Sequence, residues 1–128
     1  MGKDNEKDRD ADDAKRMPMN SITYEDYAKL DIRTGTILSA ELIAKSRKLV
    51  KLEVTFGPEI GNRTILAGIA EFFSTEDLTG APVLAVLNLE PRTMFGIESH
   101  GMILAAKNDD KLSLACCDEE FDDGTRIG

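Results

Sequence analysis

Residues 48–57, KLVKLEVTFG, place the strictest limit on the fold, because apolar and polar residues alternate along them. In an extended chain, Leu52, Val54 and Phe56 point to one side, and the intervening polar side chains point to the other. The segment is therefore predicted to be a strand with one face in a core and the other in water. A turn at 57–62 is expected to follow it.

The preceding residues 31–42, DIRTGTILSAEL, alternate in the same way. Gly35 inside this predicted strand favours a bulge or strong coiling, which small barrels need. The side chains expected to share one face are Ile32, Thr34, Thr36, Leu38, Ala40 and Leu42.

Further strands are predicted towards the C-terminus. RTILAGI (63–69) is a third strand, and the nearly continuous apolar run APVLAVLNL (81–89) is typical of a central strand. HGMILAA (100–106) and LSLACC (112–117) lie on either side of the polar segment KNDDK (107–111), and this arrangement predicts a hairpin.

Short helical turns are predicted between the strands. One lies within SITYEDYAKL (21–30), with Thr23 as its N-cap, and another within AEFFSTEDLTG (70–80), capped by Ser74 or Thr75. Acidic residues in the first turn of each suit the helix dipole. Five or six short strands, with one helical turn between the third and the fourth, predict an all-β fold. We expect a five-stranded OB-type barrel with short helical connections.

The length of 128 residues favours one domain. Residues 1–20 hold almost no branched apolar side chains and are expected to form a disordered charged tail, which leaves 21–128 as the barrel domain. No apolar run approaches the roughly 20 residues of a membrane span, and no signal peptide opens the sequence, so the cytoplasm is the expected location. Cys116 and Cys117 are expected to be reduced, and with a single His no metal site or cofactor is expected.

The net charge of −8 argues against a non-specific nucleic-acid binder, whose surface is normally basic. Within this acidic chain, however, Lys45, Arg47, Lys48 and Lys51 fall within seven residues that contain no acid. A solvated edge is the structural alternative. The clustering without acids favours a surface that binds an anionic ligand.

The segment NLEPRTMFGIESHGMILAA (88–106) supplies a second group of candidates. Arg92 carries a planar, permanently charged guanidinium that suits phosphate. Ser99 can donate to a phosphate or to a ribose 2′-hydroxyl, and Asn88 can bind a base edge. Met102 offers a polarizable apolar surface on which a base could rest.

Structural alternatives for these residues stay open. Arg92 could form a plain surface ion pair with Glu98, Asn88 could stabilise a turn, and Met102 could belong to the core. The stretch as a whole is expected to leave a strand, form a rigid loop and a turn set by Gly96, and enter a second strand. Gly96 would allow either a positive φ or a close backbone approach.

Four motifs follow one another along the chain: D-I-R-x-G-x-I, K-L-x-x-L-x-V, R-x-I-x-x-G-I and N-L-x-P-R-x-M-x-G-I-E-S-x-G-M-I-L-A-A. Together they resemble the tRNA-binding domain family, and the resemblance covers essentially all of 22–128. That family is an OB-fold module. It occurs as free-standing dimeric tRNA-binding proteins and at the C-terminus of, or as a subunit with, methionyl-tRNA synthetases.

The resemblance implies a non-catalytic, structure-specific tRNA-binding module that assists an aminoacyl-tRNA synthetase of the methionyl type. It also implies a homodimer whose interface uses Ile22–Leu30 and the C-terminal segment after Ala115. An enzyme is not expected, because a single His leaves no Ser-His-Asp or Cys-His set. The candidate RNA-binding residues are Lys45, Arg47, Lys48, Lys51, Asn88, Arg92, Ser99 and Met102.

The sequence departs from the family pattern at several positions. Glu90 stands where relatives often carry Lys, and His100 stands where they carry Gln or Asn. Each lost basic residue removes a counterion-release contribution, so weaker RNA binding is expected. The alternative function is a protein- or peptide-binding module, as in the export-chaperone branch of the family. A further hypothesis is that the acidic residues 118–123 compete with RNA for the basic cluster.

Overall fold

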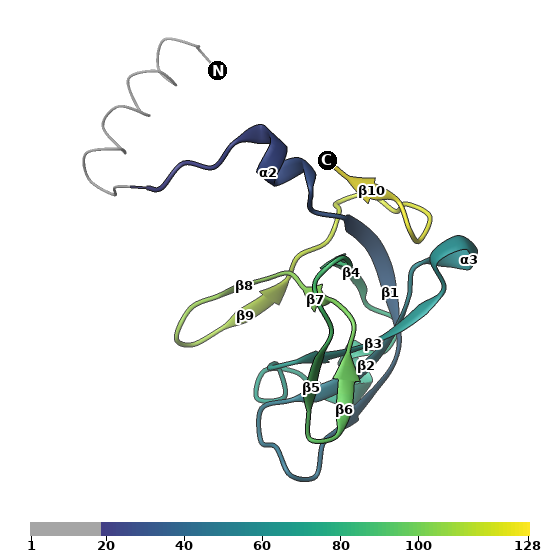
Figure 1. The fold of residues 1–128 in the computed structure, drawn as a ribbon. Coiled ribbons are helices and arrows are strands. Elements are labelled where there is room, and N and C mark those ends of the chain that lie inside the picture. Colours follow the sequence, from purple (N-terminus) through teal and green to yellow (C-terminus); the bar gives the residue numbers. More distant parts are fainter. Residues whose placement is uncertain (1–18) are drawn as a thin grey trace.

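The computed structural model describes residues 19–128, so the tail predicted at 1–20 lies, except for its last two residues, outside the described part of the chain. The fold consists of short strands joined by single helical turns (Figure 1). In chain order the elements are α2 (Tyr24–Ala28), β1 (Ile32–Leu42), β2 (Val50–Thr55), α3 (Gly57–Ile60), β3 (Asn62–Ala67), α4 (Thr75–Leu78), β4 (Pro82–Val86), β5 (Arg92–Met94), β6 (Ile97–Ser99), β7 (Met102–Ile103), β8 (Ala105–Lys107), β9 (Leu112–Leu114) and β10 (Arg126–Ile127).

The main sheet is antiparallel and has the order β3-β2-β1-β4-β7, with β10 paired to the start of β1. The long strand β1 organises it by pairing with two strands in succession. Its first half pairs with β4, its second half pairs with β2, and Thr36 takes part in both ladders. A strand shared in this way bends the sheet around on itself, as closure of a small barrel requires.

The two ends of the sheet meet along a seam between β3 and the segment that joins β6 to β7. The His100 N–H donates to the Thr64 carbonyl at 2.8 Å. The Leu66 N–H donates to the side-chain oxygen of Ser99 at 3.0 Å. These few bonds replace a full ladder, and the result is the predicted OB-type barrel with short helical connections.

The core confirms the alternation of β2, since Leu52, Val54 and Phe56 are almost completely buried. Phe56 also explains why the neighbouring strand carries a glycine. A Cβ atom on Gly35 would lie 2.6 Å from the Phe56 ring. The other side chains of the core cluster are Ile37, Val50, Ile65, Ile69, Leu78, Val83, Ala85 and Leu87.

The predicted facing of β1 is wrong at its centre. Leu38 is expected on the buried face, but it is 47% exposed, whereas Ile37, assigned to the other face, is fully buried. The pairing of β1 with β2 shifts register between Ile37 and Ser39, so that Ile37 lies opposite Val54 and Ala40 lies opposite Leu52. Because the extra residue of this bulge exchanges the faces of the strand, Ile37 before it and Ala40 after it both pack against the core.

The helical turns begin where the caps predict. The Thr23 side chain accepts a hydrogen bond from the Asp26 N–H, and the Ser74 side chain accepts one from the Asp77 N–H. The turn expected at 57–62 instead contains the single helical turn α3.

The 88–106 stretch differs from its prediction, because its expected loop is a β-hairpin of β5 and β6. Phe95 and Gly96 form the tip, with φ of 52° and 76°. Two successive positive φ values are typical of a type I′ hairpin turn, which explains the glycine. The following strand is interrupted at Leu104 and becomes β7 and β8, and β8 then forms the predicted hairpin with β9.

Within residues 19–128, none of the helices has the length and apolar character needed to span a membrane.

Candidate nucleic-acid interface

Three of the predicted basic residues lie in the loop between β1 and β2, residues 43–49, here called the basic loop. Lys45, Arg47 and Lys48 are all exposed. The side-chain oxygen of Ser46 accepts hydrogen bonds from the N–H groups of Lys48 and Leu49, at 3.3 and 3.1 Å. This local turn holds the loop backbone in place while the cationic side chains remain in water.

Lys51 differs from the other three because it lies in β2, directly opposite Glu41 of β1. Its ammonium nitrogen is 3.9 Å from a Glu41 carboxylate oxygen. Residues 45–51 contain no acid, but the strand pairing places one opposite Lys51. We therefore expect Lys51 to contribute less to an anion-binding surface than the three loop residues.

The β5–β6 hairpin carries the second group of candidates. Arg92 is exposed at the start of β5, and Phe95 is 52% exposed at the tip. The surface ion pair considered between Arg92 and Glu98 is not formed. Instead, Glu98 lies 2.7 Å from the Nε2 atom of His100.

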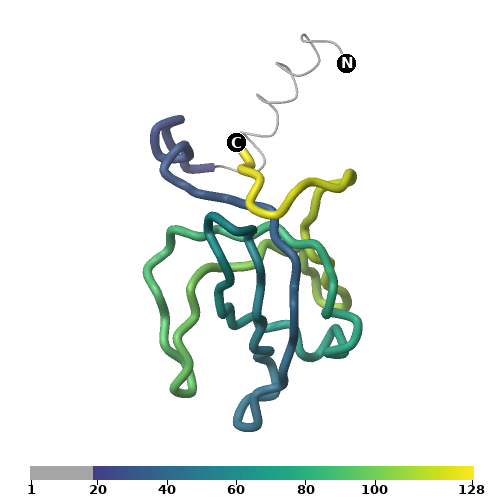
Figure 2. The backbone as a smooth tube through the Cα atoms, turned by 90° about the vertical axis from the view of Figure 1, so that its right-hand side faces the viewer, coloured from purple at the N-terminus to yellow at the C-terminus, as the bar shows by residue number. Residues whose placement is uncertain are grey.

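The fold brings the basic loop and the β5–β6 hairpin to the same end of the barrel. Both project from the lower end in Figure 1 and again in Figure 2, which is turned by 90°. Two segments that are about 45 positions apart in the sequence thus lie at one end of the barrel, although Arg92 itself is at the base of the hairpin, paired with Ser99.

Between the hairpin, β7 and β8 lies a groove of about 580 Å³, here called the apolar groove. Three predicted residues line it: Arg92, Ser99 and Met102. Met102 is 50% exposed, so it is a surface residue of the groove rather than part of the core. Leu49, the last residue of the basic loop, also lines this groove.

Lys107 lines the same groove and was missed by the sequence analysis. Its ammonium nitrogen lies 5.5 Å from the centre of the Phe72 ring, a cation–π contact that positions the side chain. The sequence placed Lys107 in a hairpin turn. Only the packing of that hairpin against the barrel brings it to the groove.

The expectation that Ser99 is an exposed contact is wrong. Its side chain is only 5% exposed, and its oxygen accepts the Leu66 N–H at the barrel seam. Ser99 therefore satisfies a buried backbone donor that has no strand partner at this point.

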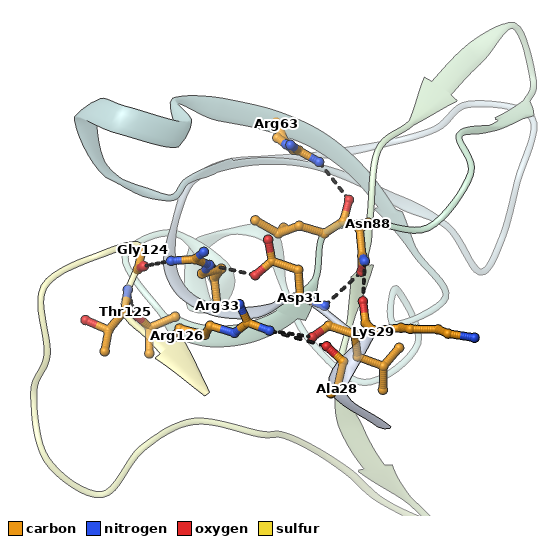
Figure 3. A network of polar contacts seen from close by, with 12 residues as sticks. Ala28, Lys29, Asp31, Arg33, Arg63, Asn88, Gly124, Thr125 and Arg126 are labelled. Atoms are coloured by element: carbon orange, nitrogen blue, oxygen red, sulfur yellow. Dashed lines mark hydrogen bonds and ion pairs between the residues drawn. The ribbon is translucent and has the colours of Figure 1, made fainter. Parts of the chain in front are cut away.

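Asn88 likewise makes structural contacts. Its side-chain oxygen accepts the Asp31 N–H at 2.8 Å, and its side-chain nitrogen donates to the Lys29 carbonyl (Figure 3). Of the two roles left open by the sequence, the structure supports that of a stabilising amide. It holds the chain between α2 and β1 against the end of β4.

Three arginines extend this network in Figure 3. The Arg33 guanidinium lies 2.7 Å from a carboxylate oxygen of Asp31 and donates to the Gly124 carbonyl at 3.0 Å. Arg63 donates to the Leu87 carbonyl, and Arg126 donates to carbonyls of the α2–β1 connection. These contacts fasten both ends of the described chain to the same end of the barrel.

The acidic segment 118–123 lies at that same end, away from the basic loop in Figure 2. Thr36 donates to a carboxylate oxygen of Asp123 at 2.7 Å, and Thr34 donates to the Asp122 carbonyl at 3.0 Å. The C-terminal end of the segment is thus held against β1, while residues 118–122 remain exposed. Its position does not support the hypothesis that it competes with RNA for the basic loop.

Cys116 and Cys117 are free thiols that follow β9. Across residues 19–128, no cluster of three or more His, Cys, Asp or Glu side chains has an arrangement that could hold a metal ion.

A small barrel with a cationic loop, an arginine on a neighbouring hairpin and an apolar groove that both segments border belongs to the class of OB-type ligand-binding modules. The chain is a member of the family described as "Putative tRNA binding domain", which matches residues 32–126. The family is described as a binding domain, in agreement with the expectation that the chain is not an enzyme.

Individual relatives support this assignment. The chain is 46% identical over 119 residues to a methionine–tRNA ligase of Methanospirillum hungatei, which is 92% of this chain and 17% of that protein. It is 46% identical over 106 residues to the corresponding ligase of Archaeoglobus fulgidus, covering 83% of this chain and 16% of that protein. The chain thus spans less than a fifth of the length of the curated relatives it matches.

Two solved structures share the fold over their whole length. A MetRS related protein from Pyrococcus horikoshii superimposes with a TM-score of 0.78 at 35% identity, covering 86% of this chain and 100% of that one. The chaperone CsaA from Bacillus anthracis superimposes with a TM-score of 0.77 at 30% identity, covering 85% and 100%.

Proposed function

We propose that this chain binds tRNA without catalysing a reaction and serves as an accessory module or subunit of a methionyl-tRNA synthetase in the cytoplasm. The family match carries the proposal. The exposed charges of Lys45, Arg47, Lys48 and Arg92, on two segments that border the same groove of an acidic molecule, support it. In this proposal these four side chains contact phosphates of the folded RNA.

Binding through four phosphate contacts is weak and depends on salt. Each neutralised phosphate contributes about −0.7 to −0.9 to the slope of log affinity against log salt concentration, so the expected slope is about −3. Phosphate contacts position the protein without reading sequence, and diverse tRNAs are therefore expected to bind alike. Asn88 and Ser99 are left out of the proposed contact set, because their side chains are engaged in the fold.

Two weak RNA-binding sites on one dimer bind more tightly than a single site, and we therefore include a homodimer in the proposal. None of the residues of α2 is buried, and Tyr24 and Tyr27 on the helix and Ile22 just before it are 79%, 39% and 69% exposed. Contiguous exposed apolar side chains of this kind mark protein interfaces. The contacts from Asn88 and Arg126 are made to the backbone, and they leave these side chains free to meet a second copy.

A dimer would have two RNA-binding surfaces. Once one surface has bound a tRNA, the other binds it intramolecularly, which raises the overall affinity. Analytical ultracentrifugation tests this part of the proposal. A dimer that dissociates when Ile22 and Tyr24 are both changed to Ser supports it. A wild-type monomer at micromolar concentration contradicts it.

A second candidate function is binding of unfolded polypeptide. The likeness to the CsaA chaperone favours it, as does a groove lined mostly by apolar side chains. Fluorescence anisotropy with a labelled apolar peptide, with tRNA as competitor, separates the two candidates. Peptide binding that tRNA does not displace would favour the chaperone-like function.

The main test is anisotropy with labelled tRNA at two salt concentrations, with a DNA duplex of similar length as competitor. Wild-type protein should bind tRNA in preference to DNA and lose affinity as salt rises. Lys48→Glu and Arg92→Glu should each weaken binding and reduce the salt slope by about one.

Lys111→Glu is the matched control, because Lys111 is exposed in the turn of the β8–β9 hairpin, outside the proposed contact set. Its reversal makes the same change in net charge and should have a much smaller effect. Equal losses from all three reversals would mean that only net charge matters. No binding at low salt would reject the proposed function.

A further inference from the structure

The apolar groove is lined mostly by apolar side chains, which the phosphate contacts of the proposed function do not involve. Its floor is formed by side chains such as Leu66, Met94 and Met102, and its volume of about 580 Å³ falls within the range of small-molecule sites. Met94 ends β5 and Met102 begins β7, and both line the one groove, which thus contains two thioethers. Thioethers make favourable contacts with aromatic rings.

The rim of the same groove carries charge of the opposite sign to the chain as a whole. Arg92 and Lys107 line it together with a single acid, Glu90, on a chain whose net charge is −8. Lys107 is held by its contact with Phe72, and Arg92 is exposed. An apolar floor beneath a cationic rim suits a ligand that has both a flat apolar face and a negative charge.

We propose that this groove receives an unpaired nucleobase of the bound RNA, with the flanking phosphates at Arg92 and Lys107. The proposal rests on the RNA-binding function proposed above and specifies which part of the RNA that site takes. A paired base is stacked on both faces and cannot lie against Met102, whereas the bases of loops and ends can turn outwards. The site therefore selects RNA that has accessible unpaired bases, and the basic loop binds phosphates of any RNA.

Anisotropy with three labelled probes tests the inference on the full chain: tRNA, a short oligoadenylate, and a fully paired RNA duplex with as many nucleotides as the oligoadenylate. A thioether–aromatic contact contributes about 0.3–1.5 kcal/mol, so its removal is expected to lower the affinity by roughly two- to tenfold. Met102→Ala is expected to weaken tRNA and oligoadenylate binding by about that factor and to leave duplex binding unchanged. Lys48→Glu is expected to weaken all three.

Leu38→Ala is the matched control, because Leu38 is 47% exposed, close to the 50% of Met102, and does not line the groove. It should change none of the three affinities. Since Met102 is half exposed, its truncation should leave the fold intact, and an unchanged unfolding temperature verifies this.

A direct readout is the methyl resonance of Met102 in protein labelled at methionine methyl groups. A base lying on the thioether shifts this resonance upfield through its ring current, and the duplex leaves it in place. The inference is overturned if tRNA binds but Met102→Ala has no effect, or if it weakens duplex binding equally. Absence of binding to any of the three RNAs rejects the proposed function itself, which is a distinct result.

Discussion

The substitution Ser99→Ala tests whether the side-chain oxygen of Ser99 has a structural role or contacts RNA. The side-chain oxygen of Ser99 accepts the Leu66 N–H at 3.0 Å, where β3 meets the segment after β6. Both residues are buried, at 5% and 8% exposure, so water cannot replace the lost acceptor without opening the seam. The substitution removes no more than one oxygen atom and leaves the backbone unchanged.

The expected loss follows from the unsatisfied donor. A buried N–H group without a partner costs about 1–3 kcal/mol. For a domain of this size, 1 kcal/mol lowers the unfolding temperature by roughly 4 °C, so the expected decrease is about 4–12 °C. The neighbouring bond from His100 to Thr64 remains, which limits the damage to local opening of the seam.

Thermal unfolding followed by circular dichroism measures the decrease, and hydrogen exchange locates it. The Leu66 amide should exchange faster in Ser99→Ala than in the wild type. Ser113→Ala is the control, because Ser113 is exposed on β9 and should not change the unfolding temperature.

tRNA affinity, measured well below the unfolding temperature, should be the same for Ser99→Ala and wild type. A variant that unfolds at the wild-type temperature but binds tRNA more weakly would refute this reasoning. It would instead make Ser99 a direct contact to RNA, reached by movement of the seam.

Three further predictions concern other parts of the molecule. Gly124→Ala should lower the free energy of unfolding by about 1–3 kcal/mol in chemical denaturation, because Gly124 has φ of +90° and an added Cβ would collide with the Phe56 carbonyl oxygen. Gly61→Ala, also at positive φ but with open space around it, is its control and should cost less. Asn88→Ala should cost about 1 kcal/mol and speed hydrogen exchange at the Asp31 amide, while exchange in β2 stays unchanged. A titration of tRNA across several salt concentrations should give a slope of about −3, and a slope near zero would contradict binding through phosphates.

Local pattern predicted most elements of this fold correctly. The alternation in β2, the Thr23 and Ser74 caps and the β8–β9 hairpin depend on interactions between residues close in sequence. Such interactions can be recognised from spacing alone. The family motifs, similarly, lie in the linear order of the residues, and the family match to 32–126 confirms them.

Predictions that depended on a strand's neighbours were less successful. The bulge in β1 puts Ile37 and Ala40 on the core side together and leaves Leu38 exposed, because register is set by the partner strand. The register between β1 and β2 also places Glu41 opposite Lys51. Glu41 thereby offsets the charge of one residue in a cluster that contains no acid in the sequence. The hairpin of β5 and β6 was missed because its strands are only three residues long.

The candidate site, too, was only partly predictable from the sequence. The sequence by itself determined which side chains are available: a run of cations at 45–51, an arginine at 92 and a methionine at 102. Tertiary structure alone decided which of them face solvent together, because exposure and hydrogen-bond partners depend on segments far apart in the chain. It buried the Ser99 side chain, engaged both Ser99 and the exposed Asn88 in hydrogen bonds to backbone groups, and placed Lys107 beside the groove.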